Sequence, residues 1–545
     1  MLSCCVLDCY VDEPACFGVP PFVSPYPRYI YGALSEAGVD EGHIHCLTID
    51  SLRNGDYRFE RSYDMVFLVG GAVVPGRYLG SRIGTAAEIR RIAERNPGQR
   101  IAIGGLISYV LPGGDNVTLV RNDIEKYARH FAGGGEEDER RTAPEIARWA
   151  VLGAGSVRAH PRFPDIICEI ETSRGCPRRG HCSFCSEGLF ERVEFREPED
   201  VIAEIDALIR AGVSRFRLGR QADILQYKSD CAGFTGGFPR PVPGPIGELL
   251  SELRARKERG LISVLNIDNA NPGTIAAFPD ESSSILKDLA ATVTPGDTMA
   301  LGIESFDEEV VRRNNLKVFP REALRAIEII NGIGGARIDS IPSLLPGVNL
   351  LHGLDGETVE TFEKNYRSLS EILERGLLVK RINIRQVIPF PGTPAHAKKY
   401  APSKSVENRF TYYRDRIRSE IEHPMLVNIY PPGTILRQGQ VLETQAGYSY
   451  AKQIASYSIT LKIPMELPLM SFHDVVIISH RERSLMALPF PININTLPQK
   501  ALELIPGIGK KGATDIILRR PFASLEQASA YLNNVSIDIK RSMIV

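Results

Sequence analysis

The sequence has few cysteines, almost no tryptophan, no long apolar segment and almost no net charge. The 545 residues include one tryptophan and ten cysteines, and ten cysteines are too few for a disulfide framework in a chain of this length. No apolar run approaches the ~20 residues that a membrane helix needs, and the opening MLSCCVLDCY lacks the cationic region of a signal peptide. A net charge of −1 argues against a polyanion binder that uses its whole surface, although a local basic face remains compatible with it. We therefore expect a globular, cytoplasmic protein with no membrane part.

What the sequence does contain is an alternation of strand and helix patterns, which is typical of α/β proteins with parallel sheets. Residues 1–132 are predicted to form a Rossmann-like domain. Residues 133–164 are predicted to be a linker, because GGGEEDERR joins glycines to a charge run. The next α/β region, 165–400, has the size of a (β/α) barrel. Short strands predict a small β-barrel over 425–488, and 493–545 is predicted to be helical.

Glycines follow two predicted strands of the first region, at Gly70-Gly71 and Gly104-Gly105. Ligands of parallel sheets bind beyond the carboxyl ends of the strands. Bare glycines there either let a ligand approach the backbone or form tight turns, and the spacing favours turns. In the second region, a loop containing CAGFTGGFPRPVPGP follows the predicted strand SRFRLGR. A lid over an active site and a plain insertion both fit this loop.

Three cysteines, Cys176, Cys182 and Cys185, lie close together directly after the predicted strand DIICEIE. Thiolates are ligands for zinc and for iron–sulfur clusters. A closed zinc site needs four ligands, and here no fourth cysteine is near, although His181 could replace it. A loop with three cysteines can instead hold a [4Fe–4S] cluster with one iron open to another ligand. The spacing favours the cluster over zinc and over unrelated free cysteines.

The cysteine loop, its place after a strand and the barrel around it resemble the radical S-adenosylmethionine (SAM) superfamily. The usual loop of that family is C-x3-C-x2-C with an aromatic residue before the last cysteine. Phe184 supplies the aromatic, whereas the first gap here is five residues. Within the superfamily, the chain resembles the branch of methylthiotransferases, elongator-type enzymes and cobalamin-dependent enzymes. The resemblance covers about 165–400, and its further motifs are specific as a set: LGRQ at 218–221, NANP at 269–272, GIES at 302–305, GLDGET at 353–358 and PFPGTP at 389–394.

This resemblance implies an enzyme whose three cysteines hold a [4Fe–4S] cluster and whose open iron binds SAM. One electron, from a donor such as ferredoxin or flavodoxin, then cleaves a C–S bond of SAM. The resulting 5′-deoxyadenosyl radical takes a hydrogen atom from the substrate. An alternative role for Glu304 is to cap a helix, and Gln221 could be a plain polar strand end. The implied contacts with SAM are Phe184, Gly219, Gln221, Asn269, Glu304 and Ser305.

The first region resembles the cobalamin-binding-like domain that precedes the barrel in one branch. The matching residues are Pro20-Pro21 before a helix, and then Ile103-Gly-Gly105. The Asp-x-His-x-x-Gly motif that supplies a cobalt ligand is absent, and His43 and His45 fit surface or strand positions better. The open alternatives are cobalamin bound without a histidine of this chain, or a domain that has lost it.

The β-rich region 425–488 occupies the place of the small RNA-binding barrel of methylthiotransferases. Aromatic and basic residues interleave there, which suits base stacking and phosphate binding, but alternating tyrosines are equally typical of a half-buried strand. These residues are Tyr448, Tyr450, Lys452, Tyr457 and Lys462.

The segment LIPGIGKK at 504–511 resembles a helix-hairpin-helix, the module that we expect over 493–545. Its Gly507, Gly509, Lys510 and Lys511 would bind a phosphate at a helix N-terminus. A helical cap that contacts another protein is the alternative.

The leading hypothesis is a radical SAM enzyme that modifies a nucleic acid, RNA in particular. The second is a radical SAM enzyme acting on a small metabolite or a protein, with methylation through cobalamin as one form. The third is a nucleic-acid-binding scaffold with a structural cluster.

Overall fold

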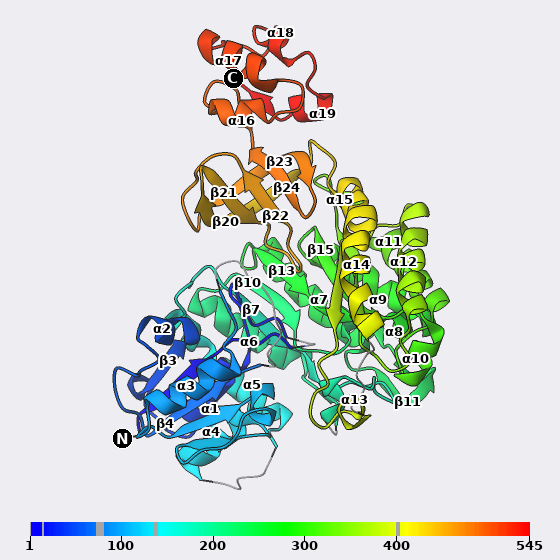
Figure 1. The fold of residues 1–545 in the computed structure, drawn as a ribbon. Coiled ribbons are helices and arrows are strands. Elements are labelled where there is room, and N and C mark those ends of the chain that lie inside the picture. The colour runs from blue at the N-terminus through cyan, green and yellow to red at the C-terminus, as the bar shows by residue number, and fades with distance from the viewer. Residues whose placement is uncertain (1, 14–15, 72–80, 135–139, 191, 399–403) are drawn as a thin grey trace. The chain divides into compact units, whose positions relative to one another are not determined.

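The first predicted α/β region is a five-stranded parallel sheet in the computed structural model, which describes all residues except 1, 14–15, 72–80, 135–139, 191 and 399–403. The strand order is β3-β1-β4-β5-β6, and an order of this flavodoxin-like kind places a ligand crevice at the carboxyl edge. Residues of β1 and β4 are buried on both faces because helices cover both sides. The elements are β1 (Cys4–Asp8), α1 (Tyr26–Glu36), β3 (Ile44–Thr48), α2 (Ile49–Asn54), β4 (Met65–Val69), α3 (Ala86–Arg95), β5 (Ile101–Gly104), β6 (Val117–Leu119) and α4 (Ile124–Gly133), drawn in blue to cyan in Figure 1.

The segment 133–164 is largely helical where it is described, rather than the linker that the charge run predicts; residues 135–139 lie outside the described residues. It contains α5 (Ala143–Leu152) and the 3-10 helix η3 (Gly153–Ala159). Helix α5 packs on α1 through buried Tyr29 and Trp149. The two backbones meet closely, since a Cβ on Gly32 would lie 2.0 Å from the carbonyl oxygen of Trp149. Burial of the apolar face of 143–157 against α1 stabilises helix in this segment, although a polar run precedes it.

A second parallel sheet has the order β13-β10-β7-β2. Its edge strand β2 (Phe22–Val23) comes from the N-terminal region and pairs with the start of β7, Phe22 beside Ile167. Two of the other strands confirm the predicted DIICEIE and SRFRLGR. Their bounds, with those of the covering helices, are β7 (Ile167–Glu171), α6 (Pro198–Ala211), β10 (Arg215–Gly219), α7 (Pro243–Glu258) and β13 (Val264–Ile267).

Short elements complete this first unit, which comprises residues 1–292 and 388–400. The Gly- and Pro-rich loop is a β-hairpin of β11 (Asp230–Thr235) and β12 (Phe238–Arg240). The remaining pieces are β8 (Ser173–Arg174), β9 (Glu194–Phe195), β14 (Asn269–Ala270), α8 (Pro272–Ala277), α9 (Pro279–Thr292) and α13 (Pro394–Lys398).

The second unit comprises 293–387 and 401–545. In it β15, β18 and β19 pair in parallel, and Figure 1 shows helices α11 and α12 on their outer side. Residues 337–342 form a hairpin of β16 (Arg337–Ile338) and β17 (Ile341–Pro342), whose turn residues Asp339 and Ser340 both have positive φ. The longer elements are β15 (Asp297–Glu304), α10 (Glu308–Arg313), α11 (Pro320–Gly334), β18 (Leu344–His352), α12 (Val359–Glu374), β19 (Arg381–Gln386), α14 (Lys404–Ile417) and α15 (His423–Ile429).

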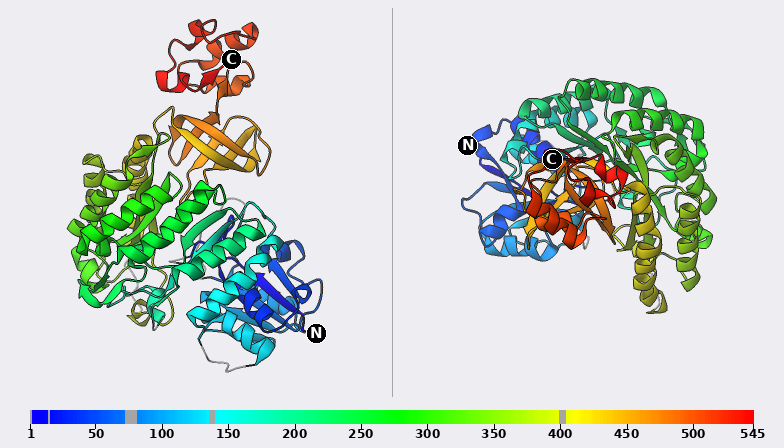
Figure 2. Two further views of the ribbon diagram at one scale, coloured as in Figure 1. Left: turned by 180° about the vertical axis from the view of Figure 1, so that it is seen from behind. Right: turned by 90° about the horizontal axis from the view of Figure 1, so that it is seen from above.

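A closed barrel of order β20-β21-β22-β24-β23 follows, as the short strands predict. It docks at the amino ends of β15 and β18: the Ser456 amide donates to Asp297 (3.1 Å), and Leu345 shares the core of the barrel with Leu436. Figure 2 shows it in orange. The strands are β20 (Ile435–Gln445), β21 (Tyr448–Lys452), β22 (Thr460–Ile463), β23 (Phe472–Arg481) and β24 (Ser484–Pro489).

The C-terminal module is helical and closes on itself, because β26 (Met543–Ile544) pairs with β25 (Ile492–Asn493). Its core continues into the outer face of β23 and β24 through Ile478 and Leu488. Its helices, red in Figure 2, are α16 (Gln499–Glu503), α17 (Gly509–Arg519), α18 (Ser529–Leu532) and α19 (Ile537–Lys540). Among the described residues, none of the helices has the length and apolar character needed to span a membrane.

Candidate active site

The three cysteines lie on one loop that follows β7 and β8 at the carboxyl end of the second sheet. The amide of Cys185 donates to the carbonyl of Cys182 (3.2 Å), which closes a turn between the last two. The ring Nε2 of His181 lies 3.2 Å from the carbonyl oxygen of Cys176, so this histidine also holds the loop backbone. In the described part of the chain, no three His, Cys, Asp or Glu side chains converge on a single metal ion. Three thiols on one short loop are a donor set that suits the corners of an iron–sulfur cluster.

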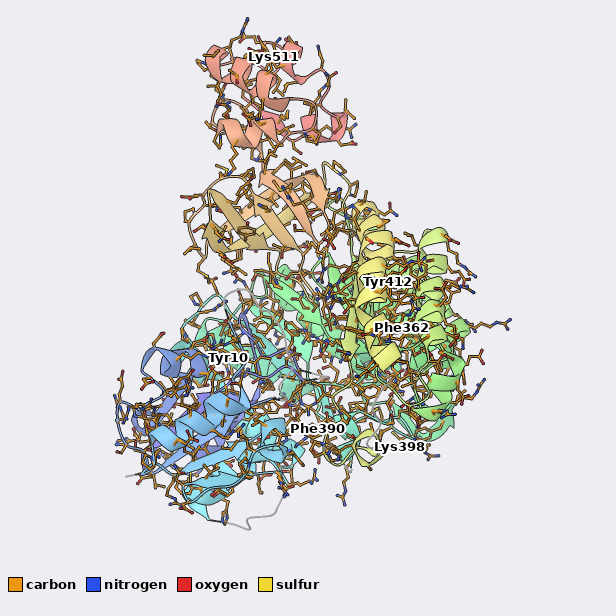
Figure 3. The ribbon with its side chains drawn as sticks, in the orientation of Figure 1. Tyr10, Phe362, Phe390, Lys398, Tyr412 and Lys511 are labelled. Atoms are coloured by element: carbon orange, nitrogen blue, oxygen red, sulfur yellow. The ribbon has the colours of Figure 1, made fainter. Side chains whose placement is uncertain are left out.

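The PFPGTP motif packs beside this loop. The amide of Ala395 donates to the carbonyl of Ser183 (2.9 Å), and the Thr393 hydroxyl donates to the carbonyl of Phe390 (2.7 Å). The Phe390 ring, labelled in Figure 3, meets the Tyr109 ring edge-on at 5.5 Å. The motif therefore links the cysteine loop to the first sheet.

The LGRQ motif lies at the end of β10, where Gly219 and Gln221 are buried. The Gln221 amide donates to the Leu218 carbonyl (2.8 Å) and accepts from the Thr172 hydroxyl (3.3 Å). A Cβ on Gly219 would lie 2.8 Å from a carboxylate oxygen of Glu169. Both residues thus have structural roles, and contact with SAM remains a prediction for them.

Arg220, within the same motif, is a site residue that the sequence analysis missed. Its Nε donates to the Tyr26 hydroxyl (2.6 Å) and its Nη1 to Glu187 (2.9 Å). Tyr26 in turn donates to Glu13 (3.0 Å). Burial opposes the charge, but Glu187 and the other nearby groups raise the pKa of Arg220 well above its ordinary value. The positive φ of 56° at Arg220, directly after a glycine, is the local feature that directs it there.

Phe184 and Asn269 are both half-buried, Phe184 in the cysteine loop and Asn269 in β14. The neighbouring Asn271 caps α8 by accepting from the Gly273 amide (3.0 Å). The NANP motif therefore starts a helix, and its first residue stays a predicted SAM contact.

Glu304 and Ser305 lie at the carboxyl end of β15, in the second unit. Glu304 has a positive φ of 67° and is 9% exposed. Burial raises its pKa to about 7, against the opposing charges of Lys317 and Arg385. The helix that follows is capped by Asp307, which accepts from the Glu309 amide (3.1 Å), so Glu304 does not have the capping role.

Ser305 belongs to the same turn. Its hydroxyl accepts from the Asp307 amide (3.1 Å) and reaches Asn365 at 3.5 Å. These bonds fix the end of β15. In the GLDGET motif, the Glu357 carboxylate likewise binds the Gly353 amide and His352.

A pocket lies in the first unit, between the carboxyl edge of the first sheet and the residues that follow Cys185. Val69 of β4 and Leu106, which follows β5, form one side, and Leu189 and Phe190, which follow the cysteines, form the other. The lining is also rich in arginine: Arg121, Arg140, Arg174 and Arg220.

The charges of this pocket are partly paired. Arg174 binds Asp123 and lies 4.4 Å over the Phe190 ring. Burial raises the pKa of Asp123, but the charges of Arg174 and Arg141 outweigh it and lower the pKa below the ordinary value. Asp123 therefore stays ionised beside the pocket.

The glycines at the strand ends pack closely against other atoms of the chain, and Gly105 also lines the pocket. A Cβ on Gly70 would lie 2.8 Å from Ile107, and one on Gly105, which has a φ of +82°, would lie 2.4 Å from the Gly70 carbonyl. Gly71 and Gly104 are equally close to protein atoms. This agrees with the turn interpretation; residues 72–80, which follow, lie outside the described residues.

The sequence model of the Radical SAM superfamily matches residues 170–369, which include the cysteine loop, β10 and Glu304. The chain belongs to the radical SAM superfamily. It is a radical SAM iron–sulfur enzyme. Binding of the cluster by the cysteine loop stays a prediction, and this loop is called the cluster loop below. A nucleic-acid scaffold with a merely structural cluster is thereby excluded as the main function.

The chain is also similar to several relatives and to solved structures. A protein of Archaeoglobus fulgidus named only "Uncharacterized protein" is 38% identical over 96% of both chains. A tRNA-2-methylthio-N(6)-dimethylallyladenosine synthase of Corynebacterium urealyticum is 22% identical over 62% of this chain and 59% of its own. The structure of the radical SAM methyltransferase TsrM from Kitasatospora setae aligns with a TM-score of 0.46 and 16% identity, over 72% of this chain and 75% of that one.

The predicted phosphate site of the C-terminal module is exposed. Gly507, Gly509, Lys510 and Lys511 come together at the start of α17, and both lysines are exposed; Lys511 is labelled in Figure 3. Helix α17 has no side-chain cap at its N-terminus.

Basic side chains of the chain lie over the tyrosine rings of the small barrel. Lys462 lies 4.1 Å and Lys500 3.6 Å from the Tyr448 centroid, and Arg381 lies 5.5 Å from that of Tyr457. These rings take part in cation–π contacts within the chain. Base stacking on them remains a prediction.

Proposed function

We propose that this radical SAM enzyme acts on a small substrate with a corrinoid bound between the first sheet and the cluster loop. The observation that carries the proposal is the pocket that the first sheet and the cluster loop line together. One wall is the carboxyl edge of a flavodoxin-like parallel sheet, where such sheets bind cofactors. The other wall is Leu189 and Phe190, which directly follow the cluster cysteines.

The chemistry of the lining suits a partly polar cofactor. Leu106, Leu189 and Phe190 give it an apolar face, while Arg121 and Arg140 supply hydrogen-bond donors. None of its described lining residues is a histidine. His43 and His45 lie at the amino end of β3, on the opposite edge of the sheet.

A bound corrinoid would supply a cobalt centre suited to methyl transfer, and a bound cluster would supply one-electron chemistry to SAM. The chain's own residues bind and orient these groups. Arg220 fixes the wall of the pocket by joining Tyr26 of α1 to Glu187 of the cluster loop. The apolar face limits water at the place where the radical would react. An external electron donor remains a prediction.

Cobalt content tests this proposal. Protein produced with hydroxocobalamin should carry about one cobalt per chain, with the spectrum of a cobalamin that lacks histidine ligation. Leu106→Glu should lose the cobalt because it places a charge on the apolar face. Val110→Glu is the matched control, since Val110 is 49% exposed and close in sequence. Wild-type protein without cobalt, or full cobalt in Leu106→Glu, would refute the corrinoid.

A nucleic-acid substrate is the second candidate, and one observation favours it. The N-terminus of α17 presents free backbone donors beside exposed Lys510 and Lys511, which suits a phosphate. Against it, the small barrel docks at the amino ends of β15 and β18, whereas Glu304 is at the carboxyl end of β15. At ~3.3 Å per residue, eight residues of strand put the two ends roughly 25 Å apart.

Filter binding tests the second candidate. Lys510→Glu should weaken RNA binding by about tenfold and lower its salt dependence. Arg519→Glu changes the charge equally at the other end of α17 and serves as control. Equal RNA affinity in Lys510→Glu and wild type would remove the main support for a nucleic-acid substrate.

A further inference from the structure

An arginine enters the cluster loop from within the gap between the first two cysteines. Arg178 is 7% exposed, and its Nη1 donates to the Sγ of Cys182 at 3.7 Å. Its guanidinium also lies 5.2 Å from the ring centroid of Phe238. A cation therefore lies directly beside a sulfur that the cluster uses.

A hairpin holds this arginine in place. The turn between β11 and β12 is Gly236-Gly237, and both residues have positive φ, as a two-residue hairpin turn requires. The Arg179 amide donates to the Gly237 carbonyl (2.8 Å), and the Arg179 side chain stacks at 3.7 Å on Phe234. The Gly- and Pro-rich hairpin thus contacts and stabilises the five-residue segment between Cys176 and Cys182.

We propose that Arg178 is a positioning residue that raises the reduction potential of the cluster. One-electron reduction adds a negative charge to the cluster, and a buried cation that hydrogen-bonds a ligating sulfur stabilises that charge. The effect is strong here because Arg178 and Cys182 are both screened from water. The five-residue gap gives the loop the length to bring Arg178 under the hairpin. This proposal is independent of the corrinoid.

Three variants test the role of Arg178. Arg178→Met removes the charge and the donor, and Arg178→Lys keeps the charge. Arg179→Met is the matched control, because Arg179 is the exposed neighbour that stacks on the same hairpin. The measurements are iron per chain, the midpoint potential followed by electron paramagnetic resonance without SAM, and hydrogen exchange of 176–185 in the iron-free protein.

Arg178→Met should keep about four irons per chain. At a fixed potential its ratio of reduced to oxidised cluster should fall by about tenfold, a shift of about 59 mV for one electron. Arg178→Lys should recover most of that ratio. Both methionine variants should speed hydrogen exchange of the loop, but Arg179→Met should leave the potential unchanged.

An unchanged potential in Arg178→Met would overturn the proposal, as would an equal shift in Arg179→Met. If Arg178→Met loses its iron, Arg178→Gln replaces it in the comparison with Arg178→Lys, and equal potentials in these two would overturn the proposal. Loss of iron from Arg178→Lys as well would show that Arg178 only packs the loop, which also overturns it.

Discussion

Two loops of this chain contain adjacent basic residues next to a glycine, and the two loops differ in how far these side chains are buried. In the cluster loop, Arg178 is buried against Phe238 and Cys182. In the C-terminal module, Lys510 and Lys511 are exposed at the start of α17. In the first pair a hairpin from elsewhere in the chain covers Arg178, although Arg179 stays exposed, whereas both lysines of the second pair face water.

The difference shows that a basic pair has no fixed meaning in a sequence. A buried guanidinium must be paired, so its position is fixed by its partners and it can tune a neighbouring group. An exposed ammonium is hydrated and screened, and it contributes mainly to the long-range attraction of anions. The following predictions test this contrast, from the largest effect to the smallest.

Replacing Cys176, Cys182 and Cys185 together by alanine should abolish iron binding altogether. Wild-type protein prepared without oxygen should contain about four irons per chain, measured by colorimetric iron analysis. Cys231→Ala is the control, because Cys231 is exposed on the hairpin and should retain all the iron. Stoichiometric zinc without iron in the wild type would contradict the cluster.

Arg220→Met should lower the free energy of unfolding by about 3–5 kcal/mol, because it leaves Glu187 buried without its ion pair. Lys511→Met should change it by less than about 0.5 kcal/mol, since that side chain is exposed. Urea denaturation of both variants checks the contrast. Similar losses in the two would break the distinction between buried and exposed cations.

Glu304 extends the contrast to a buried acid. Its pKa in the folded chain is about 7 against an ordinary 4.5, chiefly because of burial. The folded state therefore binds this proton more tightly, so the stabilisation is complete below pH 4.5 and is lost as the pH rises through 7. Relative to Glu304→Gln, wild-type stability should fall by about 3 kcal/mol over this range.

Denaturation of wild type and Glu304→Gln at several pH values measures this difference. A difference that stays constant between pH 4.5 and 8 would show that Glu304 is ionised in the folded chain throughout. Lys317 and Arg385 would then outweigh the burial.

The two glycines of the C-terminal turn should differ in their tolerance of a side chain. A Cβ on Gly507 would lie 2.2 Å from the Asn534 carbonyl oxygen, whereas Gly509 has open space around it. Both have positive φ. Gly507→Ala should cost about 2–4 kcal/mol from strain and overpacking, and Gly509→Ala about 1 kcal/mol from strain alone. Melting temperatures compare them, and equal losses would mean that the turn relaxes freely.

Much of the fold could be predicted because its signals are local. The buried strands read as apolar runs, and the three cysteines share one loop. The helical nature of 143–157 and the hairpin at 337–342 were missed, because a charge run masks the first and two positive-φ residues interrupt the second. Within the site, Asp307 rather than Glu304 caps α10, a choice that depends on which carboxylate reaches the first amides.

The sequence by itself determined the cysteine loop, the order of strands and helices, and the exposed basic turn, because each depends on residues close together in the chain. Only the tertiary structure decided where the pocket lies and which charges are buried. Arg220 meets a tyrosine 194 positions away, and Glu169 of β7 accepts from the amide of Phe17. Such contacts follow from how sheets and helices pack, and burial then forces each charged group to find a partner.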